Sequence, residues 1–131
     1  MTGGTGPRPF GRDRRIRKRA DFLRVQSEGQ RASTPHFTLL VALGPEAGPS
    51  RLGIVVTKKI GNAVARNRVK RVCRECFRLW PDFVPGGIDL VVIAKEGAPE
   101  LALAAVRGEW ERAHGKLLER CRAVASGVKK A

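Results

Sequence analysis

Residues 57–78, TKKIGNAVARNRVKRVCRECFR, constrain the fold of this chain more than any other stretch. Apolar side chains recur there at steps of three and four residues, which places them on one face of a helix. They are Ala65, Val69, Val72, Cys73, Cys76 and Phe77. The opposite face carries Asn67, Lys70, Arg71, Arg74 and Arg78. One side of this helix therefore suits a protein core, and the other side suits a polyanion.

The flanking residues set the limits of this helix. Asn62 is a good N-cap, because its side chain can accept a hydrogen bond from an early helical N–H, and Pro81 marks the end. We therefore expect the helix over residues 63–80. The residues RLGIVVT at 51–57 predict a strand before it, and IDLVVIA at 88–94 predicts a central strand buried on both faces.

The remaining elements are read in the same way. Residues 18–28 predict a short helix that Gly29 ends, and PHFTLLVAL at 35–43 predicts a strand. Pro99 suits the first turn of a last helix over 100–124. The order helix, strand, strand, helix, strand, helix predicts an α+β fold with one sheet covered by helices.

The charge of the chain is large and local. The 131 residues carry a net charge of +14 with a pI near 11.2. Residues 8–19 hold seven basic residues and one acid (+6), and residues 58–78 hold eight and one (+7), which leaves +1 for the rest. This pattern indicates a nucleic acid or an anionic membrane as partner. We expect a flexible basic tail over 1–17, one domain over 18–125 and a frayed tail over 126–131.

Several classes of protein are disfavoured. No apolar run of about 18 residues predicts a transmembrane helix, and the first residues lack the apolar core of a secretory signal. Three cysteines do not make a disulfide framework, so a cytoplasmic protein with no disulfide partner is expected. Cys73 and Cys76 fall mid-helix on the apolar face, which favours buried hydrophobes over a zinc or redox site.

The basic segment resembles a known family signature. KKIGNAVARNRVKRVCRE at 58–75 is similar to the signature of the bacterial ribonuclease P protein subunit, in which basic residues precede a Gly-Asn pair, an R-N-R tripeptide and further basic residues. The matching residues here are Lys58, Lys59, Gly61, Asn62, Arg66, Asn67, Arg68, Lys70, Arg71 and Arg74. The Asp21-Phe22 pair and the strand patterns agree in layout, so the resemblance spans roughly residues 14–120.

This resemblance implies a fold and a function. The fold is a two-layer α/β sandwich with about four strands, three helices and a left-handed βαβ crossover. The function is that of the protein subunit of ribonuclease P, an endoribonuclease whose catalytic RNA removes the 5′ leader of precursor tRNA. By this resemblance the protein is expected to bind that RNA and the leader and to supply no catalytic residue. The Mg²⁺ cofactor is bound mainly by the RNA.

The resemblance also implies two sets of site residues. The RNA-binding set is Lys58, Lys59, Asn62, Arg66, Asn67, Arg68, Lys70, Arg71 and Arg74. The leader-cleft set is Phe22, Phe37, Arg17 and Lys18, with Gln26 and Leu40 standing where many relatives carry aromatics. We expect no metal ion to be held by the protein alone, with Asn67 as the residue suited to contact a metal-bound water.

Other interpretations remain open at this point. A basic helical face is often only a solvated face, and Phe22 and Phe37 taken alone are more often core residues. A non-catalytic RNA-binding protein of the ribosomal or RNA-chaperone type would carry similar charges. A DNA-binding helix would need a second helix just before it, and here the expected strand at 51–57 argues against that class.

Overall fold

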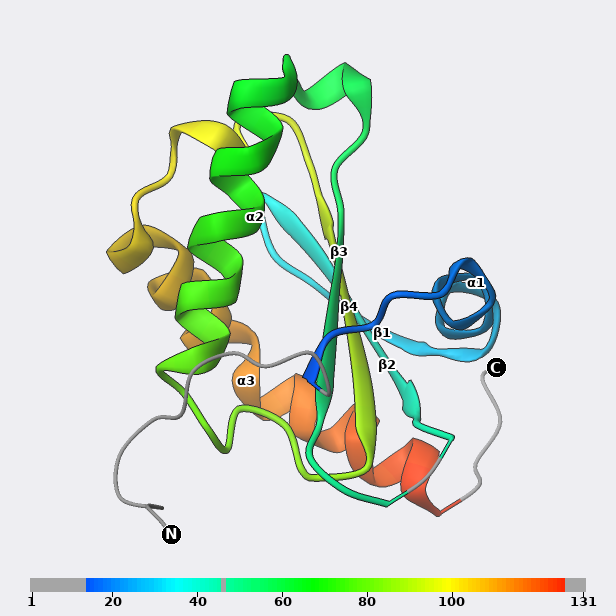
Figure 1. The fold of residues 1–131 in the computed structure, drawn as a ribbon. Coiled ribbons are helices and arrows are strands. Elements are labelled where there is room, and N and C mark those ends of the chain that lie inside the picture. Colours follow the sequence, from blue (N-terminus) through cyan, green and yellow to red (C-terminus); the bar gives the residue numbers. More distant parts are fainter. Residues whose placement is uncertain (1–13, 46, 127–131) are drawn as a thin grey trace, which may run out of the picture.

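The computed structural model describes residues 14–45 and 47–126 (Figure 1). The helices are α1 (Arg19–Glu28), α2 (Ala63–Arg78) and α3 (Leu103–Ala125). The strands are β1 (Gln30–Ser33), β2 (Phe37–Leu43), β3 (Arg51–Val55) and β4 (Ile88–Ala94). Two short 3₁₀ turns, η2 (Lys58–Ile60) and η3 (Ala98–Glu100), precede α2 and α3.

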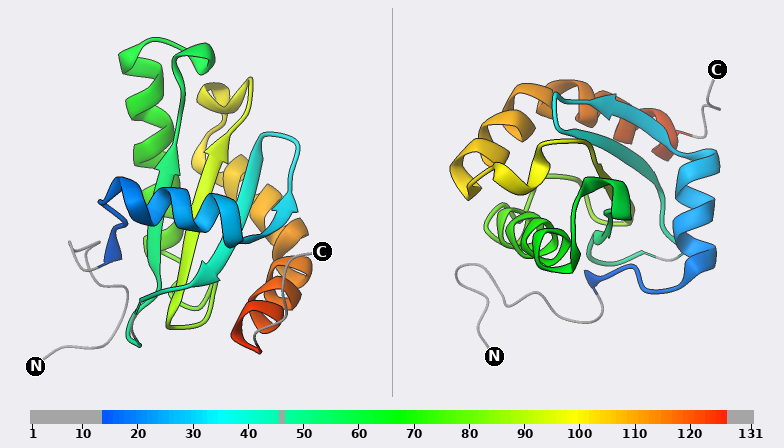
Figure 2. Two further views of the ribbon diagram at one scale, coloured as in Figure 1. Left: turned by 90° about the vertical axis from the view of Figure 1, so that its right-hand side faces the viewer. Right: turned by 90° about the horizontal axis from the view of Figure 1, so that it is seen from above.

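The four strands form one mixed sheet in the order β1-β2-β4-β3. The pairs β1–β2 and β2–β4 are antiparallel, and β3–β4 is parallel. Helix α2 connects the two parallel strands. In the left view of Figure 2, where α2 lies behind the sheet and both strands run upward, β4 lies to the right of β3. The crossover is therefore left-handed, an arrangement that few proteins adopt, and the expected α+β sandwich is confirmed.

Helices cover both faces of the sheet (Figure 2). Helices α2 and α3 cover one face, where the larger core contains Phe37, Phe77, Phe83 and Trp110. The short helix α1 lies across the other face. A smaller core there consists of Ile16, Val25, Leu40, Ala42 and Val91, with Phe22 packed against it.

Helix α2 follows its predicted pattern closely. It begins at Ala63 as expected, and the Oδ1 of Asn62 accepts a hydrogen bond of 2.9 Å from the N–H of Ala65. It ends at Arg78, two residues earlier than predicted. The thiols on its apolar face are free and buried, and burial raises the pKa of Cys76 to about 12. The prediction of buried hydrophobes at these positions is confirmed.

One whole strand, the end of β3 at Val55 and the starts of two other elements differ from the sequence-based expectation. Strand β1 was not predicted, because its residues QRAS have no apolar period and become a strand by pairing with β2. Strand β2 begins at Phe37 because Thr34 and Phe37 form a tight turn, with the N–H of Thr34 donating to the Phe37 carbonyl at 2.8 Å. Helix α3 begins at Leu103, since Pro99 belongs to η3 and Leu101 is extended.

The N-terminal boundary of the domain also needs correction. The N–H of Ile16 donates to the Leu52 carbonyl at 2.9 Å, and the Ile16 side chain is buried. Arg14 donates from Nε to the Ser50 carbonyl at 3.2 Å. Residues 14–17 therefore belong to the domain along the edge of β3, and not to a flexible tail. The expected tail residues 1–13 and 127–131 lie outside the described residues.

Candidate nucleic-acid interface

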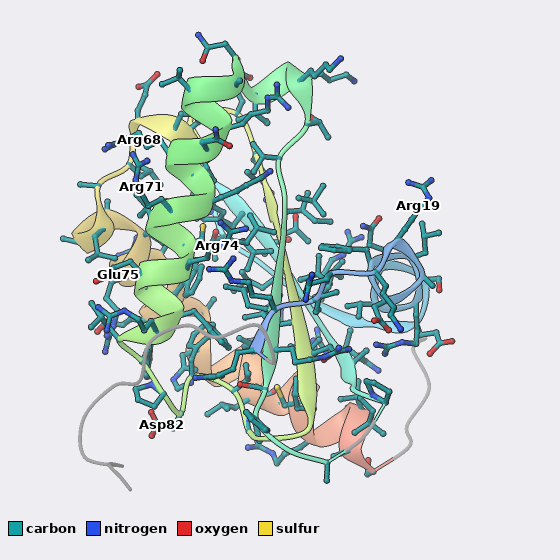
Figure 3. All side chains as sticks on the ribbon, viewed as in Figure 1. Arg19, Arg68, Arg71, Arg74, Glu75 and Asp82 are labelled. Atoms are coloured by element: carbon teal, nitrogen blue, oxygen red, sulfur yellow. The ribbon has the colours of Figure 1, made fainter. Side chains whose placement is uncertain are left out.

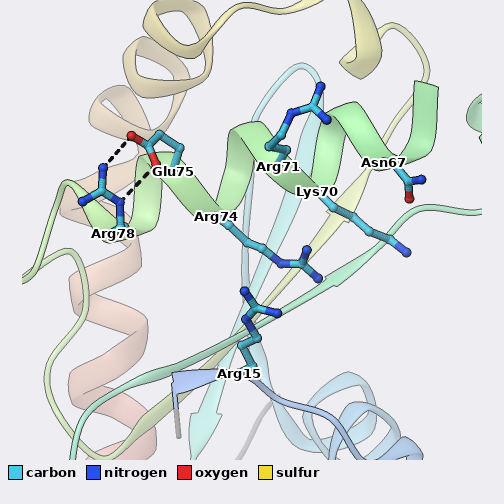
Figure 4. Close-up of a pocket in the computed structure, with 7 residues that line it drawn as sticks. All are labelled: Arg15, Asn67, Lys70, Arg71, Arg74, Glu75 and Arg78. Atoms are coloured by element: carbon cyan, nitrogen blue, oxygen red, sulfur yellow. Dashed lines mark hydrogen bonds and ion pairs between the residues drawn. The ribbon is translucent and has the colours of Figure 1, made fainter. Parts of the chain in front are cut away.

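The outward face of α2 lines an open groove of about 570 Å³. Figure 3 shows Arg68, Arg71, Arg74 and Glu75 along this helix, and Figure 4 shows the groove itself. The lining residues are Arg15, Asn67, Lys70, Arg71, Arg74, Glu75 and Arg78. Six of these seven come from α2, because steps of three and four residues keep side chains on one helical face. Arg15 comes from the N-terminal segment, so the groove depends on tertiary packing.

The charges in this groove are only partly compensated. Arg78 donates to Glu75 from Nη2 at 2.6 Å and from Nε at 3.1 Å. The hydrogen bond from Arg78 lowers the pKa of Glu75. None of the ion pairs among the described residues includes Lys70, Arg71 or Arg74. These three cations are therefore available to an external anion.

Arg74 lies close to a second cation, Arg15, within the groove. The pKa of Arg74 is lowered mainly by partial burial and, to a smaller extent, by repulsion from Arg15. In Figure 4 the guanidinium ends of Arg15 and Arg74 face each other across the groove. Two cations held in this way repel a metal ion and attract a group such as phosphate, which Arg can bind with two parallel hydrogen bonds.

A second groove adjoins the first on the α1 side of the sheet. It is lined by the half-buried ring of Phe22 and by Arg17, Gly53 and Ile54, among others. It shares Arg15, Lys70 and Arg74 with the groove on α2. The predicted leader-cleft residues Phe22 and Arg17 thus lie beside the predicted RNA-binding helix. Lys18 lies further along, in a third groove near residues 44–45 and 47–49.

The prediction that Phe37 lines the leader cleft is wrong. Its ring is fully buried on the α2–α3 face of the sheet and meets Trp110 edge-on, with ring centroids 6.3 Å apart. No face of the ring is left for a base. The sequence could not decide this point, because β2 has apolar residues on both faces. Leu40 and Ala42, which point to the opposite face of β2, lie in the smaller core on the α1 side.

The predicted RNA-binding residues divide into two groups. Asn67, Lys70, Arg71 and Arg74 line the groove on α2. The others lie outside it: Lys58, Lys59, Asn62, Arg66 and Arg68. Within this second group some side chains hold the local fold. The Nε of Arg66 donates to the Gly61 carbonyl at 3.2 Å, and the Nε of Arg68 donates to the Pro99 carbonyl at 3.0 Å.

Sequence reasoning missed an ion-pair cluster that holds α1 against the sheet. Asp89, which is 1% exposed, accepts hydrogen bonds of 2.8 and 2.7 Å from Arg51 and of 2.6 Å from Arg24. The hydrogen bond to Asp89 is the main cause that raises the pKa of Arg51. The available signal was an acid inside the apolar strand IDLVVIA, because buried carboxylates are almost always paired.

Two kinds of site are not found in the part of the chain that the structure describes. No group of three or more His, Cys, Asp or Glu side chains there could hold a metal ion. Among those same residues, no helix is long and apolar enough to span a membrane.

The fold and the grooves define a class of protein: a small α+β domain that offers a cationic helix face to a polyanion. The family model described as Ribonuclease P matches residues 10–118. The chain belongs to the ribonuclease P protein family.

Individual relatives and structures agree with this assignment. The ribonuclease P protein component of Syntrophus aciditrophicus is 48% identical over 92 residues, which cover 70% of this chain and 76% of the relative. That of Desulforapulum autotrophicum is 38% identical over 113 residues, covering 86% and 96%. The RNase P protein from Thermotoga maritima has a TM-score of 0.67 at 36% identity, covering 81% and 96%. A Staphylococcus aureus RNase P protein has a TM-score of 0.71 at 33% identity, covering 79% and 94%.

Proposed function

We propose that this chain is the protein subunit of ribonuclease P in tRNA processing, and that it binds the catalytic RNA through the groove on α2. The observation that carries the proposal is the set of cations in that groove, of which Lys70, Arg71 and Arg74 have no acidic partner among the described residues. Phosphate contacts of this kind supply much of the affinity of proteins for nucleic acids.

The protein leaves the cleavage chemistry to the RNA. The two histidines of the chain are engaged elsewhere: His36 pairs with Glu109, and the Nε2 of His114 lies 2.7 Å from the Phe83 carbonyl. Neither lines the groove on α2. The groove residues do not fit a directly bound Mg²⁺, because their charges repel it, so we assign that ion to the RNA. The side-chain oxygen of Asn67 is a neutral acceptor for a hydrogen bond from a water molecule bound to such an ion.

We assign the 5′ leader of precursor tRNA to the groove beside Phe22. A half-buried aromatic ring next to Arg15, Arg17, Lys70 and Arg74 combines a stacking surface with phosphate contacts, as proteins that bind single-stranded nucleic acid do. The chain has no tyrosine. Stacking in this groove therefore depends on the phenylalanine, and charge and apolar contact supply the remainder.

The competing classes fit the molecule less well. An RNA-binding protein of the ribosomal or chaperone type would explain the charge but not the family match over residues 10–118. A DNA-binding helix-turn-helix places a helix just before the recognition helix. Here β3 and η2 precede α2.

The leader assignment is tested by replacing Phe22 with alanine in the complex with the catalytic RNA. We expect binding of precursor tRNA with a leader to weaken about tenfold, since stacking of one base is worth about 1–3 kcal/mol. Binding of mature tRNA is expected to be unchanged. Leu23→Ala is the matched control, because Leu23 is an exposed neighbour on α1. Equal losses for both tRNAs would show that Phe22 is only structural.

A further inference from the structure

Gly53 occupies the middle of β3, where glycine is normally unfavourable. A glycine inside a strand weakens it and often marks a close approach by another group. Gly53 is not among the glycines with positive φ, which are Gly48, Gly87 and Gly97 in the described part of the chain. The backbone conformation therefore does not require glycine here, and the reason must lie in the surrounding space.

The space above Gly53 is occupied by two side chains from different segments. A Cβ at this position would lie 2.6 Å from Cε1 and 2.8 Å from Cζ of Phe22, and 3.1 Å from Cβ of Ile16. The first two distances are shorter than any tolerated carbon contact. Phe22 comes from α1 and Ile16 from the N-terminal segment. Both side chains pack against the backbone of β3 at the position where Gly53 has no side chain.

Both contacts shape the groove that we assign to the leader. Gly53 itself lines that groove, together with Phe22, Arg15 and Arg17. Arg15 and Arg17 flank Ile16, so a shift of Ile16 moves the two cations as well. The aromatic ring is rigid, and the Cβ of Ile16 is fixed to its backbone. A methyl group added at Gly53 would therefore displace the far end of the Phe22 ring, which moves as one rigid body, and would crowd Ile16.

We infer that Gly53 is a positioning residue for the single-stranded leader of the substrate. Its lack of a side chain seats the ring of Phe22 against β3 and keeps the neighbouring cations in place along the groove. This inference rests on the proposed function, because it assumes that the leader lies beside Phe22. Its role is indirect, acting through Phe22 and Ile16.

The test compares Gly53→Ala with Gly115→Ala in the complex with the catalytic RNA. Gly115 is an exposed glycine of α3, and a methyl group added to it would have no atom within 4 Å. We expect Gly53→Ala to weaken binding of leader-bearing precursor tRNA about tenfold, as loss of Phe22 does, with mature tRNA unaffected. Gly115→Ala should change neither affinity. Unchanged leader affinity in Gly53→Ala, or an equal loss for mature tRNA, would overturn the inference.

A double variant tests the contact through stability, including the case in which Gly53→Ala is too unstable for binding measurements. Truncating Phe22 removes the two shortest contacts, so Gly53→Ala should lower the melting temperature less in a Phe22→Ala background than in the natural chain. An equal or larger decrease there would show that the ring is not what Gly53 accommodates. If Phe22→Ala alone spares leader binding, the leader assignment fails. If it weakens leader binding while Gly53→Ala does not, only this inference fails.

Discussion

Arg74 is the groove cation whose replacement tests the proposed RNA interface most sharply. It is partly buried, faces Arg15 and has no acidic partner among the described residues. We expect Arg74→Ala to weaken binding of the catalytic RNA and to reduce the salt dependence of that binding. The reason is that the variant makes one charged contact fewer with the RNA phosphates. Fewer counterions are then released when the protein binds.

The expected magnitude follows from the geometry. A hydrogen bond to a charged group contributes about 1.5–3 kcal/mol, which corresponds to about 10- to 150-fold in affinity at low salt. One lost phosphate contact lowers the slope of log K against log salt by about 0.7–0.9. Between about 50 and 200 mM salt, the ratio of natural to variant affinity should therefore shrink by about threefold.

The assay is a salt titration of RNA binding with two control proteins. Arg112→Ala removes one charge from an exposed position on α3 that lines none of the grooves described above. The double variant Glu75→Gln with Arg78→Gln removes a pair whose charges already compensate each other in the same groove. Both controls should leave the slope nearly unchanged. If either matches Arg74→Ala, or if Arg74→Ala keeps the natural slope, the assignment of phosphate contacts to this groove is refuted.

Two further predictions concern stability. Asp89→Asn should lower the free energy of unfolding, measured by urea titration, by about 3 kcal/mol, since it leaves two arginines without their buried partner. As a control, Glu111→Gln removes an exposed ion pair and should lower the free energy of unfolding by less than about 0.5 kcal/mol. Similar losses in the two variants would refute this reasoning. Burial raises the pKa of Glu109, but hydrogen bonds from His36 and Thr34 outweigh that effect and the net pKa is lowered from 4.5. The Glu109 carboxylate therefore stabilises the fold above about pH 4.5, and this contribution is lost as the pH falls through its folded pKa. In Glu109→Gln the melting temperature should be lower at neutral pH and should fall less steeply below about pH 4.5; an unchanged acid profile would contradict this.

The elements that could be predicted from sequence are those with a local cause. Helix α2 starts where Asn62 caps it and keeps its apolar face at helical spacing. Strand β4 has the predicted bounds of 88–94, because it lies between a Gly-containing turn and the loop that leads to η3. Five of the six α2 residues that line the groove were predicted to share one helical face, and four of these five were predicted to bind RNA.

The parts that could not be predicted depend on tertiary contacts. Strand β1 exists only because β2 pairs with it. Arg15 enters the groove because Ile16 bonds to the edge of β3. Phe37 could face either side of an apolar strand, and its direction depends on packing in the core between the sheet and α3. No periodicity in the sequence carries this information.

Reconstitution with the catalytic RNA tests the central claim most directly. The measurement is the initial rate of leader removal from precursor tRNA at limiting Mg²⁺, with and without the natural protein. We expect clear stimulation by the natural protein and reduced stimulation by Arg74→Ala. Absence of stimulation at every salt and Mg²⁺ concentration would contradict the proposal that this chain is the protein subunit of ribonuclease P.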